Sequence, residues 1–591
     1  MGIADRIAQE IKDKFDDYET RQSNFMSDYN EWADIFRVKR PNKTTGIKGY
    51  SNPRLTEMFR AVNALATMEV RMMTSQDPYF ELVPYHYTVD PGTISIIEAV
   101  LDQQLRVSEH KRHLLRACTS KELFGTVIVE EPWEVVGINP YGRRLPLTAF
   151  RPRSMLQVAF DLNTSDIDRA AWLATSDVVG PHTLRRMHED TKEHGGWIKS
   201  ALNAAVEDQQ EVTTSSFVAS RLSSAGYNTL NEQKNARELI TYHGKLETLN
   251  DGVEYVASLV NREHLVRFFP NRFQHGRRGF RVARWVEFEL EPLALGLGQL
   301  LGRHHKSMDA NRKRVQDLVA FDTYGMWIID RLAGIQQNAL AIKPMGTIEA
   351  DNINALRRLD SGGVATNSGL KLEEILQNEF RTTSGATSSL QAIVTAATAS
   401  EVSLAQNEAV RNISVKAELA ADSLVRQHLE VMHFNNIELI REPLRINVDG
   451  RPTLAYPSDL WADVDFRAKV TTDKDFRPER MKKIIEVVQI LTSIRNAHPD
   501  KYDINLIPWI MELARGIGGI NPKDIIRVRS EQERMALAAQ AGMGAGGGQG
   551  APPPSPVPPE AMPGELPDLP GGMGQEQTFV GPVLASPGGS A

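Results

Sequence analysis

A long helical pattern in the C-terminal half constrains the fold more than any other feature of this sequence. Apolar residues recur at intervals of seven and four across residues 393–436, and a helix from Ile393 to Phe434 would be about 60 Å long. Because few compact domains are that wide, a large structure must surround it. Polar side chains form the opposite stripe, so we expect one packed face and one wet face. The apolar face contains Val402, Ala409, Ile413, Ala420, Leu424 and Val431, and the polar stripe contains Asn407, Arg411, Ser414, Glu418 and Asp422.

The segment before this helix has no charged residue and consists mostly of small ones. It follows a shorter predicted helix, 370–381, and the two together make up residues 366–392. Small hydroxyl groups can make transient hydrogen bonds to phosphate, whereas Lys or Arg would bind it tightly. A flexible linker between two helices would have the same composition, so both interpretations stay open. The segment comprises Thr382, Thr383, Ser384, Gly385, Ala386, Thr387, Ser388 and Ser389.

Residues 290–320 predict a basic helix, because helical periodicity returns after Pro292 and only two acids oppose the cations. Such a run is a solvated face in most proteins, but in a ring of copies it would repeat as a basic belt. The cations include Lys306, Arg312, Lys313 and Arg314. Residues 321–365 then predict short strands around a turn. Phe321, Tyr324 and Trp327 recur there every three residues, either as subunit-interface anchors or as residues buried within one subunit.

Residues 1–50 contain an amphipathic pattern that predicts one helix from residue 3 to residue 36. Its apolar stripe is mainly aromatic and therefore forms a packing surface. The stripe packs either against the body of the same chain or against a neighbouring subunit. Its members are Ile7, Ile11, Phe15, Tyr18, Phe25, Tyr29, Trp32 and Phe36.

The remaining regions predict an α+β fold that is mainly helical over the whole chain. Residues 51–289 combine helices with short strands, and residues 437–475 add strands that return to this body. Helices are expected in residues 476–535. Residues 536–591 are predicted to be disordered, because Gly and Pro dominate and little apolar area is available for burial. The strands expected in the body are 147–151, 156–160, 239–246, 254–259, 265–269 and 281–288, with helical pieces around 183–206 and a surface insertion at 212–235.

Several functional classes lack their usual signals. The sequence contains no G-x-x-x-x-G-K-[ST] or G-x-S-x-G motif, and its histidine spacings do not suit a metal site, so we expect no enzyme, cofactor or metal. The lone Cys118 is expected to be a buried helical residue. A charged N-terminus and the lack of a long apolar run predict neither a signal peptide nor a membrane span. The net charge of −7 argues against gripping nucleic acid by bulk electrostatics.

Short phrases in a fixed order support a family assignment. Thr398-Ala399-Ser400-Glu401-Val402 opens the long helix, which carries Glu418, and Asp77-Pro78-Tyr79-Phe80 follows an earlier helix. Phe124-Gly125-Thr126 connects a helix to a strand, and a phrase from Glu291-Pro292-Leu293 through Gly296, Gly302 and Arg303 forms the start of the basic helix. Across residues 25–490 these phrases resemble the portal protein, the head-to-tail connector of short-tailed bacteriophages. The last phrase departs from the family's G-E-x-Y-G-R pattern, because the tyrosine is absent and the glycines are shifted.

The resemblance implies a homo-oligomeric ring, of twelve copies in the family, at one vertex of the virion capsid and assembled in the host cytoplasm. Double-stranded DNA would pass through the ring during packaging and ejection. The implied partners are the major capsid and scaffolding proteins, the terminase motor and the tail adaptor proteins. The resemblance identifies 51–289 as the wing, 290–320 as a stem helix, 321–365 as the clip, 366–392 as a second stem helix with a tunnel loop, 437–475 as returning wing strands and 476–535 as the crown.

Two other functions remain open at this point. An assembly adaptor without a channel would be a monomer or a low-order oligomer, and changes around Thr383 would not affect DNA packaging. A nuclease or other nucleic-acid enzyme would show metal-dependent turnover that is lost on mutating a carboxylate such as Asp463 or Asp465.

Overall fold

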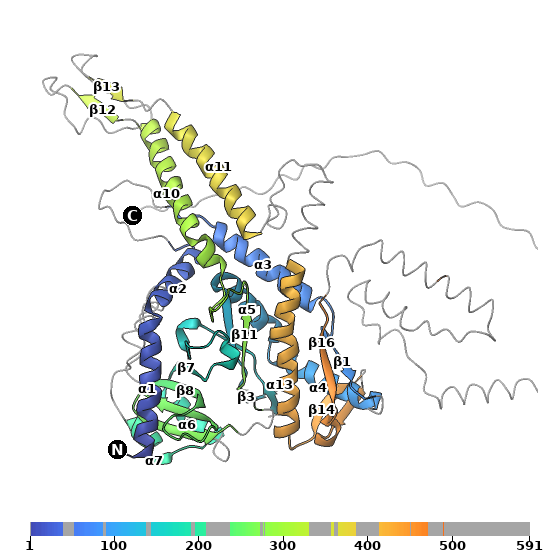
Figure 1. Cartoon of the computed structure of the whole chain (residues 1–591). Coiled ribbons are helices and arrows are strands. Elements are labelled where there is room, and N and C mark those ends of the chain that lie inside the picture. Colours follow the sequence, from blue (N-terminus) through green and yellow to red (C-terminus); the bar gives the residue numbers. More distant parts are fainter. Residues whose placement is uncertain are drawn as a thin grey trace, which may run out of the picture. The chain divides into compact units, whose positions relative to one another are not determined.

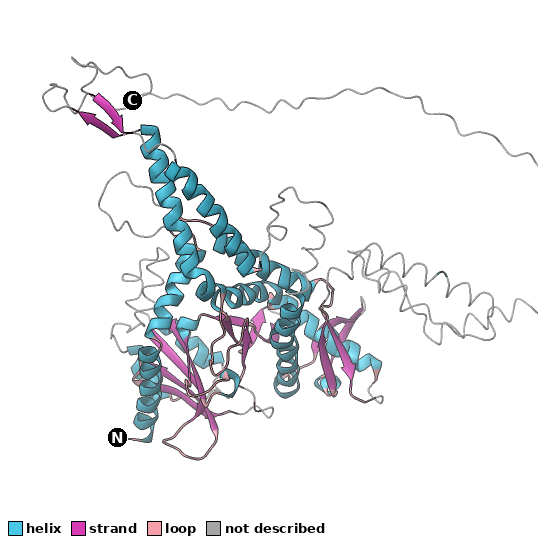
Figure 2. Ribbon diagram, turned by 45° about the horizontal axis from the view of Figure 1, so that its top comes forward, coloured by secondary structure: helices cyan, strands magenta, loops and turns pink. Residues whose placement is uncertain are grey.

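A computed structural model describes the protein in a set of ranges that mix helix and strand, with helix predominating (Figures 1 and 2). The expected combination of α and β structure is therefore confirmed. All these ranges belong to the unit Met1–Ile526. The predicted insertion at 212–235, nearly all of the predicted helical region 476–535 and the C-terminal tail 536–591 lie outside the described residues. The described residues are 2–39, 53–86, 90–137, 144–190, 196–207, 237–271, 276, 278–324, 326–329, 356–359, 364–385, 413–448, 451–470 and 489.

The N-terminal pattern forms two helices, α1 (Ile3–Arg21) and α2 (Ser23–Phe36), so the prediction of a single helix is wrong. The chain turns at Gln22, where ψ is 10° and the backbone N–H still donates to the Tyr18 carbonyl. The break lets α1 follow a β-sheet while α2 packs on helices. Most of the predicted apolar stripe is buried in the core of the same chain, which confirms the intrachain interpretation.

A five-stranded antiparallel sheet lies beneath α1. Its order is β10 (His264–Pro270), β9 (Glu254–Val260), β8 (Arg237–Lys245), β7 (Trp172–Val179) and β6 (Val158–Phe160). Three of the predicted strands correspond to β8, β9 and β10. Strand β7 was missed because its first four residues are all buried, and this removes the polar alternation that marks a half-buried strand.

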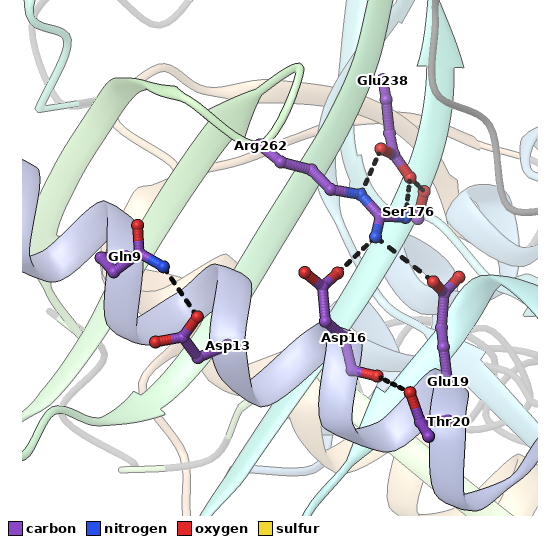
Figure 3. A network of polar contacts seen from close by, with 8 residues as sticks. All are labelled: Gln9, Asp13, Asp16, Glu19, Thr20, Ser176, Glu238 and Arg262. Atoms are coloured by element: carbon purple, nitrogen blue, oxygen red, sulfur yellow. Dashed lines mark hydrogen bonds and ion pairs between the residues drawn. The ribbon is translucent and has the colours of Figure 1, made fainter.

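Arg262 fastens α1 to this sheet (Figure 3). It lies in the turn after β9 with a φ of 59°, and its guanidinium donates to Glu238 of β8 at 2.8 Å. The same group contacts Asp16 at 2.5 Å and Glu19 at 3.3 Å, both on α1, and Glu238 also accepts a bond from Ser176 of β7. One half-buried cation thus joins the N-terminal helix to two strands.

A second core lies around α5 and the helical residues 413–439. A three-stranded sheet, β11 (Phe280–Arg284), β2 (Thr126–Glu130) and β5 (Arg151–Arg153), borders both cores. The predicted strand 281–288 ends early, at Arg284, and the predicted strand 147–151 is divided between β4 and β5. The other elements of the two cores are α3 (Glu57–Thr74), β1 (Phe80–Pro84), α4 (Pro91–Val107), α5 (His110–Phe124), β3 (Trp133–Gly137), β4 (Arg144–Thr148), η1 (Met155–Gln157), η2 (Ile167–Arg169), β14 (Leu444–Val448), β15 (Arg451–Ala455), η7 (Pro457–Leu460) and β16 (Val464–Ala468).

The pair α6 (Pro181–Asp190) and α7 (Lys199–Glu207) fits the helical pieces predicted around 183–206. These helices form a small separate cluster with the start of β8 and with β9 and β10. The predicted returning strands of 437–475 are also present, as β14, β15 and β16. Strand β16 pairs with β1, which joins the two ends of the body in one antiparallel ladder.

The step from α5 to β2 occurs where the sequence predicts it, at Gly125. Gly125 has a φ of 82°, and a Cβ there would lie 2.0 Å from the carbonyl oxygen of Ala294. Only glycine satisfies both conditions without strain. This close approach places the chain just before α10 (Leu297–Tyr324) directly against the α5–β2 corner.

Candidate functional site at the helical hairpin

Helices α10 and α11 (Val364–Ser384) run side by side as a hairpin that extends from the body (Figures 1 and 2). At its far end, β12 (Met326–Ile329) pairs with β13 (Leu356–Leu359) in antiparallel register. The order helix, strand, strand, helix agrees with the predicted succession of regions. The boundaries differ, because α10 continues to Tyr324. Phe321 and Tyr324 are therefore helical, and only Trp327 of that predicted trio is in a strand.

Polar contacts fix the register of the two helices. His304 Nε2 lies 2.8 Å from the Leu376 carbonyl oxygen, and Asn311 Nδ2 donates to the Gly369 carbonyl at 2.9 Å. Arg312 forms an ion pair with the buried Glu373. Because these contacts recur along the hairpin, sliding one helix by a turn would break all of them together.

The base of α10 is fastened to the start of the body by Asp309. Its carboxylate accepts a bond from the backbone N–H of Leu55 at 2.8 Å and one from Arg54 at 2.7 Å, and His305 lies beside it. Burial alone would raise the pKa of Asp309, but these hydrogen bonds outweigh it and hold the pKa below its usual value. The hairpin therefore rises from a fixed base.

The predicted stem cations do not share one face. Lys306 pairs with Glu31 of α2, and Arg312 turns toward α11 to pair with Glu373. Arg314 is exposed, and Lys313 is half-buried. The expected basic belt is thus divided, because Lys306 and Arg312 are matched by carboxylates of the same chain on two different helices.

The predicted tunnel-loop residues fall partly in α11. The helix extends through Ser384, three residues beyond the predicted end at Arg381, so Thr382, Thr383 and Ser384 are helical. The Thr382 hydroxyl donates to the Asn378 carbonyl at 2.8 Å, which satisfies it within the helix. Gly385 follows with a φ of 69°, as is usual after a helix end. Thr383 is exposed and Ser384 is buried, while Thr387, Ser388 and Ser389 lie outside the described residues.

The predicted long helix is described from residue 413 onward, and residues 393–412 lie outside the described ranges. Residues 413–421 are α-helical, η6 (Asp422–Arg426) is a π-helical turn, and α13 (Gln427–Leu439) continues to residue 439. Of the predicted apolar face, Ile413, Ala420, Leu424 and Val431 are buried. Of the predicted polar stripe, Glu418 and Asp422 are exposed as expected, Ser414 is buried, and Asn407 and Arg411 lie outside the described residues. Helix α13, beyond this stripe, is buried on nearly all sides.

The buried polar residues of α13 have hydrogen-bond partners on other elements. Asn436 and Gln104 of α4 exchange two hydrogen bonds of 2.8 Å, and Asn435 donates to Thr148 at 3.0 Å. A helical position with such a partner can be buried although its side chain is polar. Composition alone cannot reveal the partner.

A buried pair of histidines joins α5 to α13. The rings of His110 and His428 stack with centroids 5.1 Å apart and planes 3° apart. His110 Nδ1 lies 2.8 Å from the Tyr79 hydroxyl, and His428 Nδ1 lies 2.8 Å from a carboxylate oxygen of Glu131. Burial, with a further contribution from His428, lowers the pKa of His110 well below its usual value. Because lone pairs of parallel rings do not converge, the pair cannot chelate one metal ion.

A buried ion cluster lies between α3 and α5. Lys121 Nζ is 2.5 Å from Glu69 and 3.3 Å from Glu122, and all three side chains are almost fully buried. Burial raises the pKa of Glu122 to about 7 although Lys121 opposes the shift. Lys416, at the start of the 413–439 helix, lies 3.9 Å from the ring centroid of Trp285 and close to this cluster. Sequence analysis identified none of these residues.

Two residues considered for a nucleic-acid enzyme or a thiol nucleophile lie on separate elements of the fold. Asp465 lies on β16, where it accepts a bond from Arg467 at 3.2 Å, and Cys118 is buried on α5 as predicted. Within the described ranges, no group of three or more His, Cys, Asp or Glu side chains could hold a metal ion. Among the helices of those ranges, none combines the length and apolar content that a membrane span requires.

Comparison with known proteins adds no relative. A scan against protein-family models finds no match, and a search of curated proteins finds no significant one.

Proposed function

We propose that this chain is a portal-type subunit that forms a ring at one vertex of a phage capsid. The ring would be a non-enzymatic conduit for double-stranded DNA, and it would dock the terminase motor and later the tail. The order of the described elements supports this proposal most: the basic helix α10, the strand pair β12–β13, the antiparallel helix α11 and, farther along the chain, the helical residues 413–439 packed in the body. The major capsid and scaffolding proteins would hold the mixed α and β body in the shell.

The fixed geometry of the hairpin suits the rigid wall of a conduit. Its register is fixed by the contacts of His304, Asn311 and Arg312, and its base is fixed by Asp309. A conduit must keep its bore while DNA slides past, so its wall needs rigid helices and weak contacts to phosphate. The pairing of Lys306 and Arg312 with carboxylates of the chain reduces the positive charge available to hold DNA.

DNA packaging by assembled capsids tests the proposed contact to DNA. Thr383 is the better position for a charge, because it is exposed at the end of α11, whereas Ser384 is buried and its replacement would disturb the helix. We expect Thr383→Lys to slow packaging, since a repeated lysine would bind phosphate in every register. The control is Thr383→Gln, which adds length without charge. Unchanged DNA yield with lysine at this position would refute the DNA contact at the end of α11.

A further inference from the structure

The side of the α10–α11 hairpin that faces away from the body carries uncovered apolar side chains. On α11, Leu372 is 45% exposed and Ile375 is 54% exposed. The exposed residues on the neighbouring turns of α10 include the small Ser307 and Ala310, with the cations Arg303 and Arg314 before and after them. Large residues on one helix thus lie beside small residues on the other, and together they form a shallow groove-like surface.

Helical periodicity places the large residues of α11 and the small residues of α10 on the same face of the hairpin, as one stripe on each helix. The body side of α10 is marked by Gly298, which packs against Trp32, and by Asp309, which binds Arg54. At about 100° per residue, Ser307 lies about 180° around the helix from Gly298, and Ala310 lies about 120° from it, so both are turned away from the body side. On α11, Arg381 reaches toward Glu57 of the body. Leu372, Ile375 and Glu379 lie on the other side of that helix by the same measure.

The contacts between the helices set which residues are level along the hairpin. The His304–Leu376 and Asn311–Gly369 bonds define an antiparallel register. In that register Arg303 is level with Glu379, Ser307 with Ile375, and Ala310 with Leu372. All six residues are exposed. The cation Arg303 is therefore level with the anion Glu379, and each of the two small residues of α10 is level with a large apolar residue of α11.

We propose that two copies of this chain pack hairpin to hairpin as a symmetric dimer, with α10 of each copy lying on α11 of the other. A two-fold axis parallel to the hairpin leaves each residue at the same height along the hairpin, so residues that are level within one copy are also level between the copies. It brings Arg303 against Glu379 of the other copy, and Ile375 and Leu372 against the small residues Ser307 and Ala310. Each contact occurs twice because the interface is isologous. The four helices then enclose the exposed apolar residues between them.

Charge selects this arrangement over the other face-to-face one. A two-fold axis perpendicular to the hairpin would stack α10 on α10 and bring Arg303 toward Arg314 of the other copy. Like charges at that distance repel, whereas the parallel axis places opposite charges together. The dimer goes beyond the proposed function, because a ring uses two different faces of each subunit in head-to-tail contacts. This contact uses one face twice, and it describes the chain before ring assembly.

Sedimentation equilibrium of the full chain tests the interface. We expect wild-type protein to dimerise, and we expect Arg303→Glu or Glu379→Arg to weaken the dimer at least tenfold, since each change creates two like-charge contacts. The variant carrying both changes should regain the wild-type dissociation constant. Ile375→Glu should abolish the dimer, whereas Leu370→Glu is the matched control because Leu370 is 49% exposed on the same helix but outside the stripe.

Cross-linking supplies an independent readout. An equimolar mixture of Ser307→Cys and Ile375→Cys chains should form disulfide-linked dimers on oxidation, while Ser307→Cys mixed with Leu370→Cys should not. A wild-type monomer at all concentrations, or charge reversals without effect, would overturn the inference. Charge-reversed variants that keep the wild-type monomer–dimer equilibrium and still form rings would overturn the dimer and leave the proposed function standing. A dimer that responds as expected, in a chain that never forms rings, would support the dimer and refute the proposed function.

Discussion

Replacing Lys121 should destabilise the body more than any other single loss of charge. Its ammonium group lies 2.5 Å from Glu69 and 3.3 Å from Glu122, and the three side chains are 1–2% exposed. Lys121→Met keeps the length of the side chain and removes the charge. Two buried carboxyl groups then remain without their nearest cation. Breaking a buried pair in this way costs about 3–5 kcal/mol of unfolding free energy.

Urea unfolding followed by circular dichroism measures the effect, and hydrogen exchange of α3 and α5 peptides localises it. The control is Lys111→Met on the same helix, because Lys111 is exposed and should change the unfolding free energy by less than about 0.5 kcal/mol. A triple variant that also carries Glu69→Gln and Glu122→Gln should recover most of the loss, since no buried charge remains unpaired. A Lys121→Met chain as stable as the Lys111→Met chain would refute this reasoning.

Three further predictions concern the same body. Gly125→Ala should lower the unfolding free energy by more than about 2 kcal/mol, measured by urea denaturation, because a left-handed residue gains a Cβ 2.0 Å from the Ala294 oxygen; an unchanged midpoint would contradict it. The pKa of Glu122 is about 7 in the folded chain against 4.5 for the free group, so its contribution to stability is greatest below pH 4.5 and is lost as pH rises to 7. Glu122→Gln should therefore gain about 3 kcal/mol over wild type between pH 4.5 and pH 8, and a constant difference in unfolding free energy would refute this. The lowered pKa of His110 means that stability is present above pH 6.5 and is lost below it, by up to about 1.4 kcal/mol per pH unit; His110→Gln should flatten that slope in acid unfolding curves, and equal slopes would contradict the shift.

Regular periodicity made part of the fold predictable. Strands β8, β9 and β10 and helix α11 carry clear local patterns, and each was located within a few residues at most boundaries. The end of α11 was missed because Thr382 and Ser384 are poor helix formers, yet both hydroxyls bond back to the helix carbonyls. Local propensity does not include such bonds.

The parts that depend on distant partners could not be predicted. Lys121 on α5 is buried because Glu69 on α3 meets it, and His428 on α13 is buried because Glu131 and His110 meet it. Each partner is 52 residues or more away in the sequence. The turn at Gln22 has the same origin, because α1 and α2 follow different surfaces. Tertiary contacts override the local signal at all of these places.

For the hairpin, the sequence indicated the helices and their charge but not how the charge is matched. Lys306 and Arg312 belong to one basic run, but they point to Glu31 and Glu373 on two different helices. The exposure of Leu372 and Ile375 can be recognised only when the side of α11 that packs on α10 is known. The candidate site was thus located in the chain before its surface could be described.

The most direct test of the proposed function is single-particle electron microscopy of the purified full chain, with native mass measured on the same sample. We predict a closed ring of identical subunits with an axial hole of roughly 20 Å or more, which is wide enough for duplex DNA to pass through. A chain that remains a monomer or a dimer without a hole, even with its capsid and scaffolding partners present, would contradict the proposal.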